Sequence, residues 1–222
     1  MEPNLDLASF IDHTLLKPEA TKSDIERLCQ EAKQYQFFAV CVNPTYVSLV
    51  RKILDGTRIK ICTVAGFPLG ANLTETKIRE AALGISHGAQ EIDMVMNISA
   101  LKSSNEDLVE EDIRSVRQTC GKGIILKVIL ETAVLTQEEK VRACQIAKRV
   151  GADFVKTSTG FGSGGATVAD VLLMRKAVGK EMGVKASGGI RDYQMAIKLI
   201  EAGATRIGTS SGVKIMKEWL SH

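Results

Sequence analysis

The sequence Gly151-Ala-Asp-Phe-Val-Lys-Thr-Ser-Thr-Gly160 joins the end of one predicted helix to a short predicted strand. Gly151 is the kind of residue that ends a helix in the left-handed conformation, and Phe154-Val-Lys156 then continues as a strand. A parallel strand that is buried on both faces is normally an unbroken apolar run, so a lysine at its end is unusual. A desolvated, uncharged amine is a nucleophile. We therefore treat Lys156 as a candidate reactive group, against the alternative of a lysine that reaches solvent or pairs with an acid.

The same strand–helix unit recurs along the chain, and Gly-Ala also precedes the expected strands that follow Gly88 and Gly203. The expected strands are Phe10–Leu16, Ala39–Asn43, Ile59–Ala65, Glu91–Met96, Ile124–Leu130, Phe154–Lys156, Val184–Ala186 and Arg206–Gly208. Helical periodicity fills the segments between them, with Thr21 and Thr136 placed to begin two of the helices. No hairpin signal separates the strands, so we expect parallel strands joined by right-handed crossovers.

Eight such units in 222 residues predict an α/β protein made of a single (β/α)8 barrel, one catalytic domain over residues 1–222. A doubly wound open sheet is the alternative fold. The glycine fingerprint of a dinucleotide-binding sheet is absent after the first strand, which favours the barrel.

Composition narrows the classes of function. The net charge of +3 suits an anionic small molecule and is too small to predict binding to nucleic acid or a membrane. Five cysteines without a Cys-x-x-Cys pair, and three histidines without ligand spacing, predict no metal site, no disulfide framework and no other cofactor. The segment Met1–Asp6 has no signal-peptide pattern, and no apolar stretch is long enough to cross a bilayer. We expect a cytoplasmic protein.

Three charged residues end expected strands: Asp93, Lys156 and Lys185. A barrel gathers the carboxyl ends of its strands at one mouth, so we expect these side chains to meet. A Schiff-base lysine needs a pKa about 3 units below the ordinary ~10.4, and a second ammonium ~4 Å away supplies roughly that much. We therefore predict that Lys185 activates Lys156. Asp93 is expected nearer Lys185, sharing proton transfer with it; the alternative is an ordinary ion pair.

Other polar residues of the strands are expected to support the site. Asp12 and Thr14 in the first strand could orient catalytic groups, and Thr157 follows Lys156 directly. Lys60 and Lys127 lie toward the start or middle of their strands, which favours a supporting role or ion pairing over covalent chemistry.

Two further residues end strands beside the expected mouth. Glu131 ends the fifth strand and is a candidate partner for a lysine. Cys41 ends the second strand, and we interpret it as a packed thiol.

Two glycine loops follow the seventh and eighth strands, Ser187-Gly-Gly-Ile190 and Gly208-Thr-Ser-Ser-Gly212. Many barrels bind phosphate at this position, through backbone N–H groups and helix N-termini. Each loop could also be a simple tight turn. A third loop, Gly160-Phe-Gly-Ser-Gly-Gly165, lies beside Lys156 and could close over substrate or shape the pocket; the alternative is a flexible connection.

The chain resembles the deoxyribose-phosphate aldolase family over nearly its whole length. The segments that carry the resemblance are Glu91-Ile-Asp-Met-Val-Met-Asn97, Phe154-Val-Lys-Thr-Ser-Thr-Gly160, Val184-Lys-Ala-Ser-Gly-Gly-Ile190, Ile11-Asp-His-Thr-Leu-Leu-Lys-Pro18 and Leu126-Lys-Val-Ile-Leu-Glu-Thr132.

The resemblance implies a metal-independent class I aldolase that reversibly cleaves 2-deoxy-D-ribose 5-phosphate into acetaldehyde and D-glyceraldehyde 3-phosphate, in deoxyribonucleotide catabolism. It implies that Lys156 forms the Schiff base, while Asp93 and Lys185 donate and accept protons. It also implies a homo-oligomer, a dimer or tetramer, and a substrate phosphate bound by Gly188, Gly189, Gly208, Ser210 and Ser211.

One feature departs from the family pattern. Some members end in a tail with a tyrosine that assists proton transfer, whereas the last tyrosine here is Tyr193. We therefore do not expect a tail-assisted step.

Two other functions remain open at this stage. One is a different Schiff-base aldolase or a transaldolase-like enzyme. The other is a non-catalytic barrel that binds a sugar phosphate.

Overall fold

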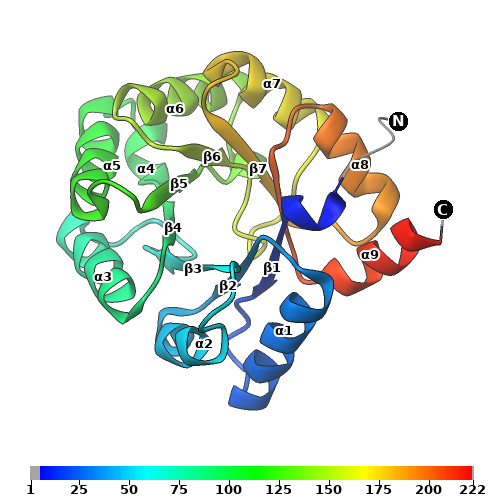
Figure 1. The fold of residues 1–222 in the computed structure, drawn as a ribbon. Coiled ribbons are helices and arrows are strands. Elements are labelled where there is room, and N and C mark those ends of the chain that lie inside the picture. The colour runs from blue at the N-terminus through cyan, green and yellow to red at the C-terminus, as the bar shows by residue number, and fades with distance from the viewer. Residues whose placement is uncertain (1–5, 222) are drawn as a thin grey trace.

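A computed structural model describes residues 6–221, which form a closed barrel of parallel strands in the order β1 to β8 (Figure 1). The strands are β1 (Ile11–Leu15), β2 (Ala39–Val42), β3 (Lys60–Ala65), β4 (Glu91–Val95), β5 (Ile125–Ile129), β6 (Phe154–Lys156), β7 (Gly183–Ser187) and β8 (Arg206–Thr209). The predicted (β/α)8 barrel is confirmed, and each expected strand overlaps an observed one. The signal-peptide reading of Met1–Asp6 falls mostly on residues 1–5, which with His222 lie outside the described residues.

Helices surround the strands as an outer ring (Figure 1). They are α1 (Lys22–Tyr35), α2 (Val47–Ile53), α3 (Thr74–His87), α4 (Ile98–Lys102), α5 (Glu106–Cys120), α6 (Gln137–Arg149), α7 (Val168–Val178), α8 (Tyr193–Glu201) and α9 (Gly212–Leu220). The sequence did not predict α4 or the 3-10 turns η1 (Leu7–Phe10) and η3 (Thr132–Val134); Pro44, expected in the first turn of a helix, begins the 3-10 turn η2 (Pro44–Tyr46) directly before α2. These elements are too short to show a helical period. Among residues 6–221, none of the helices combines the length and apolar character needed to cross a bilayer.

Local sequence accounts for where several helices begin and end. Thr21 and Thr136 each form a capping box, in which the threonine side chain accepts from the third helical residue and that residue's carboxylate accepts in return. The glycines of the three Gly-Ala pairs, Gly88, Gly151 and Gly203, have φ of 114°, 78° and 109°. This left-handed conformation ends the helix at little steric cost for glycine, and the next strand starts at once.

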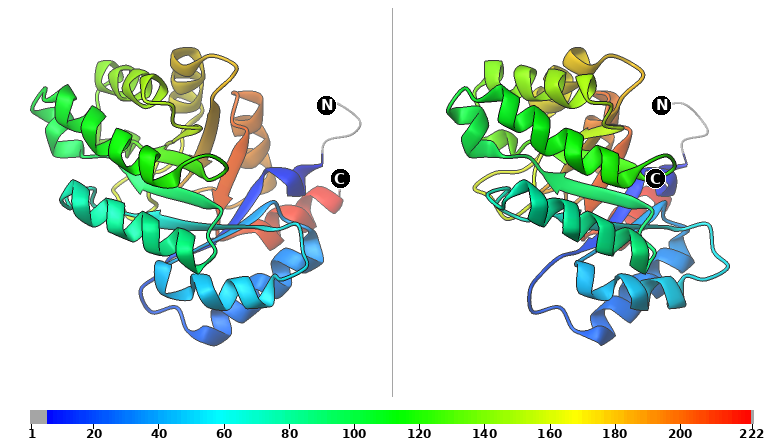
Figure 2. Two further views of the ribbon diagram at one scale, coloured as in Figure 1. Left: turned by 60° about the vertical axis from the view of Figure 1, so that its left-hand side comes forward. Right: turned by 90° about the vertical axis from the view of Figure 1, so that its left-hand side faces the viewer.

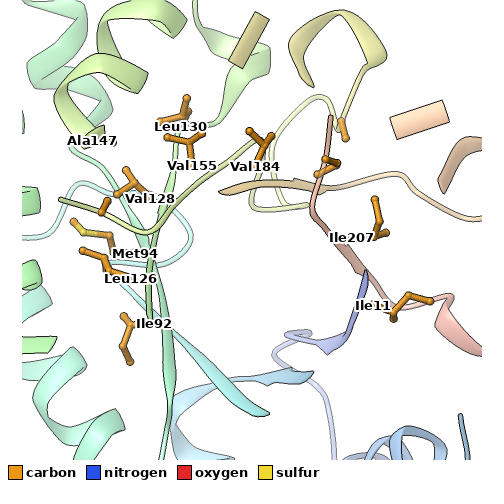
Figure 3. Close-up of a cluster of buried hydrophobic side chains, with 14 of the residues drawn as sticks. Ile11, Ile92, Met94, Leu126, Val128, Leu130, Ala147, Val155, Val184 and Ile207 are labelled. Atoms are coloured by element: carbon orange, nitrogen blue, oxygen red, sulfur yellow. The ribbon is translucent and has the colours of Figure 1, made fainter. Parts of the chain in front are cut away.

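Side chains of the strands alternate between two environments. Ile92 and Met94 of β4 point away from the barrel axis and pack beneath the helices, together with Val128, Val155 and Ile207 of neighbouring strands (Figure 3). The residues between them point into the barrel. This alternation places the buried charged residues of the strands inside the barrel.

The first and last strands close the ring. β1 pairs with β8 in parallel, with Asp12 opposite Gly208, and the two views of Figure 2 show the blue N-terminal elements beside the red C-terminal ones. This closure matters for the site, because it brings Asp12 next to side chains that follow it by almost the whole length of the chain.

Candidate active site

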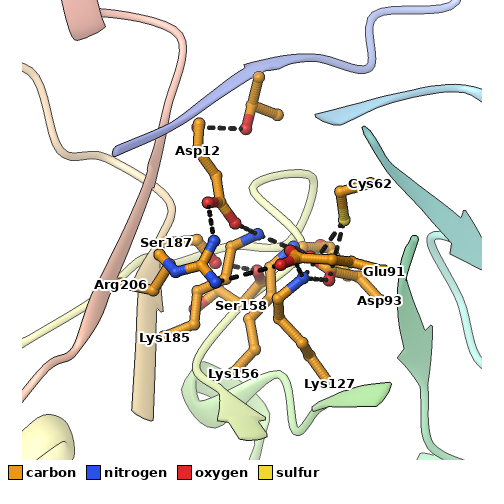
Figure 4. Close-up of polar contacts among 12 residues, drawn as sticks. Asp12, Cys62, Glu91, Asp93, Lys127, Lys156, Ser158, Lys185, Ser187 and Arg206 are labelled. Carbon is orange, nitrogen blue, oxygen red and sulfur yellow. Dashed lines mark hydrogen bonds and ion pairs between the residues drawn. The ribbon is translucent and has the colours of Figure 1, made fainter. Parts of the chain in front are cut away.

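Three lysine side chains inside the barrel converge on one carboxylate, that of Asp93 (Figure 4). The Nζ atoms of Lys156 and Lys185 each lie 2.8 Å from Oδ2 of Asp93. The Nζ atom of Lys127 lies 2.8 Å from Oδ1 of the same residue. All four side chains are buried, so the cluster is an ionic centre shielded from solvent.

Strand register brings these residues together. Asp93 of β4 pairs with Lys127 of β5, and Lys156 of β6 pairs with Lys185 of β7. Register partners on parallel strands point to the same side of the sheet, which here is the inside of the barrel. The predicted meeting of Asp93, Lys156 and Lys185 is present in the structure.

One detail of that prediction is wrong. Asp93 was expected nearer Lys185, but its Oδ2 atom is equally close to Lys156 and Lys185, at 2.8 Å from each amine. The carboxylate lies between two amines that are separated by no more than twice this distance. The attraction of Asp93 therefore opposes the repulsion between the two lysines.

The neighbouring cations lower the pKa values of the two buried aspartates, Asp93 and Asp12. Burial alone would raise the pKa of Asp93, but Lys127, Lys156 and Lys185 hold that pKa well below its usual range. Burial likewise acts to raise the pKa of Asp12, but the charges of Lys185 and Arg206 lower it to about 2. Both carboxylates therefore stay ionised at neutral pH, and Asp93 is poised to accept hydrogen bonds rather than to donate one.

Asp12 supports the centre from β1, as predicted. Its Oδ2 atom accepts from Lys185 at 2.5 Å, and its Oδ1 atom accepts from Arg206 at 2.6 Å. Thr14 donates to the backbone carbonyl of Asp12 at 2.8 Å. Lys127 makes ion pairs with Glu91 and Asp93, so its predicted role in ion pairing is also present.

A cavity of about 340 Å³ opens above the ionic centre. Of the three lysines that contact Asp93, Lys156 alone borders it, because Lys127 and Lys185 are completely buried beneath. Gly188, Gly189, Gly208 and Ser210 of the two glycine loops line the same cavity. Lys156 and the two glycine loops therefore border the same cavity.

Comparison with known proteins agrees with this geometry. Residues 7–218 match the family model described as DeoC/LacD family aldolase. The chain belongs to the DeoC/LacD aldolase family.

Relatives of this aldolase family match almost end to end. The deoxyribose-phosphate aldolases of Geobacillus sp. (strain WCH70) and Streptococcus gordonii are each 60% identical, over 98% and 96% of this chain and 96% of each relative. The solved tetrameric deoxyribose phosphate aldolase of Aeropyrum pernix is 36% identical, covers 97% of this chain and 91% of its own, and has a TM-score of 0.91.

The phosphate residues predicted for this aldolase divide into two groups. Gly188 and Gly189 have φ of 88° and 75°, a conformation suited to glycine that turns the loop sharply at the cavity wall. Ser211 does not border the cavity. It lies at a separate depression with His13 and Lys214, and its backbone N–H donates to the Thr209 hydroxyl at 2.9 Å.

Thr157 joins the ends of β6 and β7. Its hydroxyl donates to the backbone carbonyl of Ser187 at 2.9 Å and accepts from the Ser187 N–H at 3.0 Å. The segment after the loop Gly160–Gly165 binds the glycine loop Ser187–Ile190, because Ala166 N–H donates to the Gly188 carbonyl at 3.0 Å. A Cβ atom at Gly165 would lie 2.3 Å from that carbonyl oxygen, so glycine is required there. This loop shapes the pocket.

Two expectations for this aldolase need correction or comment. Glu131 was expected to pair with a lysine, but its Oε2 atom accepts from the N–H and hydroxyl of Thr159, and no ion pair of Glu131 occurs among residues 6–221. Glu131 lies two residues beyond the end of β5, directly before η3, and has a φ of 58°. Tyr193 lies in the core at the start of α8 and does not border the cavity.

Cys41 is fully buried, consistent with a packed thiol. The thiols of Cys41 and Cys62 lie with the Asp93 carboxylate inside a 4.8 Å cluster, a grouping that sequence spacing did not reveal. The Cys62 thiol donates to Asp93 at 3.1 Å, and burial raises its pKa well above the usual value. The lysines on the same carboxylate repel a cation, so the expectation of no metal stays a prediction that this electrostatic argument supports.

Sequence analysis assigned no role to Glu91, Arg206, Arg191 or Lys17. Arg206 contacts both Asp12 and Glu91 inside the barrel, while Lys17 and Arg191 line the cavity. The signal for Arg206 and Glu91 was present, since each is a charge at the start of an otherwise apolar strand. This pattern is less informative than Lys156 at the end of its strand, because a charged residue at the start of a strand often reaches solvent and needs no buried partner.

Proposed function

We propose that this aldolase reversibly cleaves 2-deoxy-D-ribose 5-phosphate to acetaldehyde and D-glyceraldehyde 3-phosphate through a Schiff base on Lys156. The observation that carries the proposal is the position of Lys156. It is the one lysine on Asp93 that borders the cavity, and the cavity ends at two glycine loops suited to a phosphate. Relatives that are 60% identical and bear the name deoxyribose-phosphate aldolase support the choice of substrate.

The chemistry follows from these positions. The neutral amine of Lys156 adds to the aldehyde carbon of the substrate, and loss of water gives a protonated imine. Removal of the proton from the C3 hydroxyl allows the C2–C3 bond to break. The electron pair of that bond moves toward the imine and forms an enamine. D-Glyceraldehyde 3-phosphate leaves, C2 takes up a proton, and water releases acetaldehyde from Lys156.

Asp93 and Lys185 handle the protons in this scheme. The carboxylate of Asp93 lies 2.8 Å from the amines of Lys156 and Lys185, so it can exchange a proton directly with Lys156. Lys185 is completely buried and reaches the reacting atoms through Asp93 or through a water. Asp12, Lys127 and Thr157 act by holding these groups in place.

The phosphate end is proposed to lie against Gly188, Gly189, Gly208 and Ser210, with the charges of Lys17 and Arg191 nearby. Backbone N–H groups of such loops and the N-terminus of α9 favour an anion. Ser211 begins that helix as its cap residue, so its contribution is to the loop's shape.

Reductive trapping tests this proposal. Acetaldehyde with borohydride should add one ethyl group, and peptide mapping should place it on Lys156. Separately, 2-deoxy-D-ribose 5-phosphate should release acetaldehyde. An unchanged mass would favour a non-catalytic sugar-phosphate-binding barrel. A label without acetaldehyde release would favour another Schiff-base aldolase or a transaldolase-like enzyme, and a label on Lys60 or Lys127 would overturn the site.

Lys185→Leu provides a second test of the roles. We expect slow turnover with a retained fold, while Lys60→Leu, which changes a lysine outside the cavity, should leave turnover near the original value. Near-normal turnover in Lys185→Leu would remove Lys185 from the mechanism.

We propose one catalytic domain, a cytoplasmic location, no cofactor, no nucleic-acid partner, and a homo-oligomer. The five cysteines are all buried and free, which supports a reducing compartment. The Aeropyrum pernix relative is tetrameric, and light scattering would determine the state of this chain.

A further inference from the structure

Ion pairs inside the barrel form a closed ring (Figure 4). Arg206 contacts Asp12 at 2.6 Å, and Asp12 contacts Lys185 at 2.5 Å. Lys185 contacts Asp93 at 2.8 Å, and Asp93 contacts Lys127 at 2.8 Å. Lys127 contacts Glu91 at 2.5 Å, and Glu91 returns to Arg206 at 3.1 Å. Acids and bases therefore alternate around the ring without a break.

The ring is balanced in charge. It holds three acids and three bases, and each member lies between two partners of opposite sign. The side chains of these six residues are at most 6% exposed. Because solvent does not screen them, adding or removing one charge would leave an uncompensated buried ion, which is strongly unfavourable.

Lys156 is a seventh charge attached to this ring. Its amine contacts Oδ2 of Asp93, the oxygen that also contacts Lys185, while Lys127 contacts Oδ1 of the same carboxylate. Loss of a proton from Lys156 takes the cluster from one surplus positive charge to neutrality. Loss of a proton from Lys127 or Lys185 would instead leave a ring acid with one partner fewer. Of the three lysines, Lys156 is therefore the one whose deprotonation leaves all six ion pairs of the ring in place.

We propose that Arg206 and Glu91 are positioning residues, whose ion pairs close the charge-balanced ring and thereby make Lys156 the amine that gives up its proton. This inference rests on the Schiff-base role proposed above and explains which lysine takes it. Arg206 is held in place by its guanidinium stacking 3.5 Å from the centre of the Phe38 ring, which fixes its orientation toward both acids.

The other groups that face this centre do not upset the balance. The ionisable groups near Lys156 come from the other seven strands and from the loops after β1, β5 and β7: Asp12, Lys17, Cys41, Cys62, Glu91, Asp93, Lys127, Glu131, Lys185, Arg191 and Arg206. Cys62 keeps its proton, because it donates to Asp93. Glu131 is bound to Thr159, and Lys17 and Arg191 lie toward solvent at the mouth.

The test measures the rate at which acetaldehyde is trapped on Lys156 by cyanoborohydride as a function of pH. The acidic limb of this profile reports deprotonation of the attacking amine. Arg206→Met removes a positive charge, favours the protonated amine and should move the limb to higher pH. Glu91→Gln removes a negative charge and should move the limb to lower pH. A unit charge on the order of 10 Å away at an effective dielectric of ~20 predicts a shift of about one pH unit.

The double variant Arg206→Met/Glu91→Gln removes one acid and one base, so its limb should return to the original position. If Arg206→Met does not fold, Lys127→Met removes a base from the other side of the ring and carries the same expected direction.

Lys77→Met is the matched structural control. Lys77 and Asp112 form another buried ion pair at 2.6 Å, between α3 and α5 in the helical layer. Its loss should lower stability without moving the limb.

Two outcomes overturn the inference: limbs that stay fixed in both single variants, or limbs that move in the same direction. Failure of the proposed function is recognised separately, because the unaltered protein would then trap no acetaldehyde at all. If trapping occurs and only the shifts are absent, the ring is a structural feature alone.

Discussion

The two faces of the same strands differ sharply in chemistry. In β4, Ile92 and Met94 face the helices and belong to a continuous apolar layer, while Glu91 and Asp93 face the barrel interior and belong to the ionic ring (Figures 3 and 4). Both faces are buried. The two faces therefore differ in what makes burial favourable. Apolar side chains are stabilised by leaving water and packing together, whereas each charged side chain of the ring needs a partner of opposite charge.

This difference teaches how stability and reactivity share one scaffold. Apolar burial stabilises by roughly 25 cal/mol per Å² and depends little on any single partner. A buried charge is tolerated only while its oppositely charged partners remain. Replacing one ring residue therefore changes the electrostatic energy of the other five. The outer face can thus hold the barrel rigid while the inner face carries a chemically poised amine.

The largest effect should come from Lys156, the one cation outside the charge balance. In Lys156→Met we expect turnover of 2-deoxy-D-ribose 5-phosphate to fall at least ~10⁴-fold, because no other amine borders the cavity beside Asp93. The thermal midpoint should change little, since the ring stays balanced. Steady-state kinetics and thermal melts check both, and a strongly destabilised Lys156→Met would contradict the balance.

Asp93→Asn should damage both properties at once. Three ammonium groups would lose their shared carboxylate, which should lower the free energy of unfolding by about 3–5 kcal/mol and abolish turnover. Urea titration measures the first effect and acetaldehyde release the second. A loss of turnover with unchanged stability would mean that the lysines do not depend on this carboxylate.

Ile92→Ala changes the residue next to Asp93 on the outer face of β4, and it should lower stability while leaving turnover nearly unchanged. Ile92 is completely buried and faces α3 near Gly84, so the cavity left behind should cost about 3 kcal/mol of stability. Turnover per folded molecule at 25 °C should stay within about 3-fold. A much larger loss of turnover would show that the outer layer also sets the geometry of the ring.

The smallest effect concerns pH. Asp12 has a folded-state pKa of about 2, below the unfolded value of about 3.9. Its contribution is therefore present above pH ~4 and is lost as pH falls through about 2, which amounts to roughly 2 kcal/mol. Urea unfolding between pH 5 and pH 2 should show a steeper loss in the unaltered protein than in Asp12→Asn. Parallel losses would mean that Asp12 carries no such contribution.

Much of the fold was readable from local pattern. The eight strands, the helix starts at Thr21 and Thr136, and the glycines at helix ends were predicted because each depends on residues within a few positions. Asp93, Lys156 and Lys185 were recognised as anomalies, being charges in apolar strands. A barrel topology was then enough to place all three at one centre.

The sequence by itself thus determined which strands exist and which of their charges needed an explanation. The tertiary structure alone decided how those charges are paired: Asp93 equally close to Lys156 and Lys185, Glu131 turned to Thr159, and Arg206 bridging Asp12 and Glu91. The physical reason is the separation in sequence over which each kind of interaction acts. Capping and periodicity act over a few residues, whereas the contact that joins Arg206 to Asp12 spans 194 residues and exists only because the barrel closes.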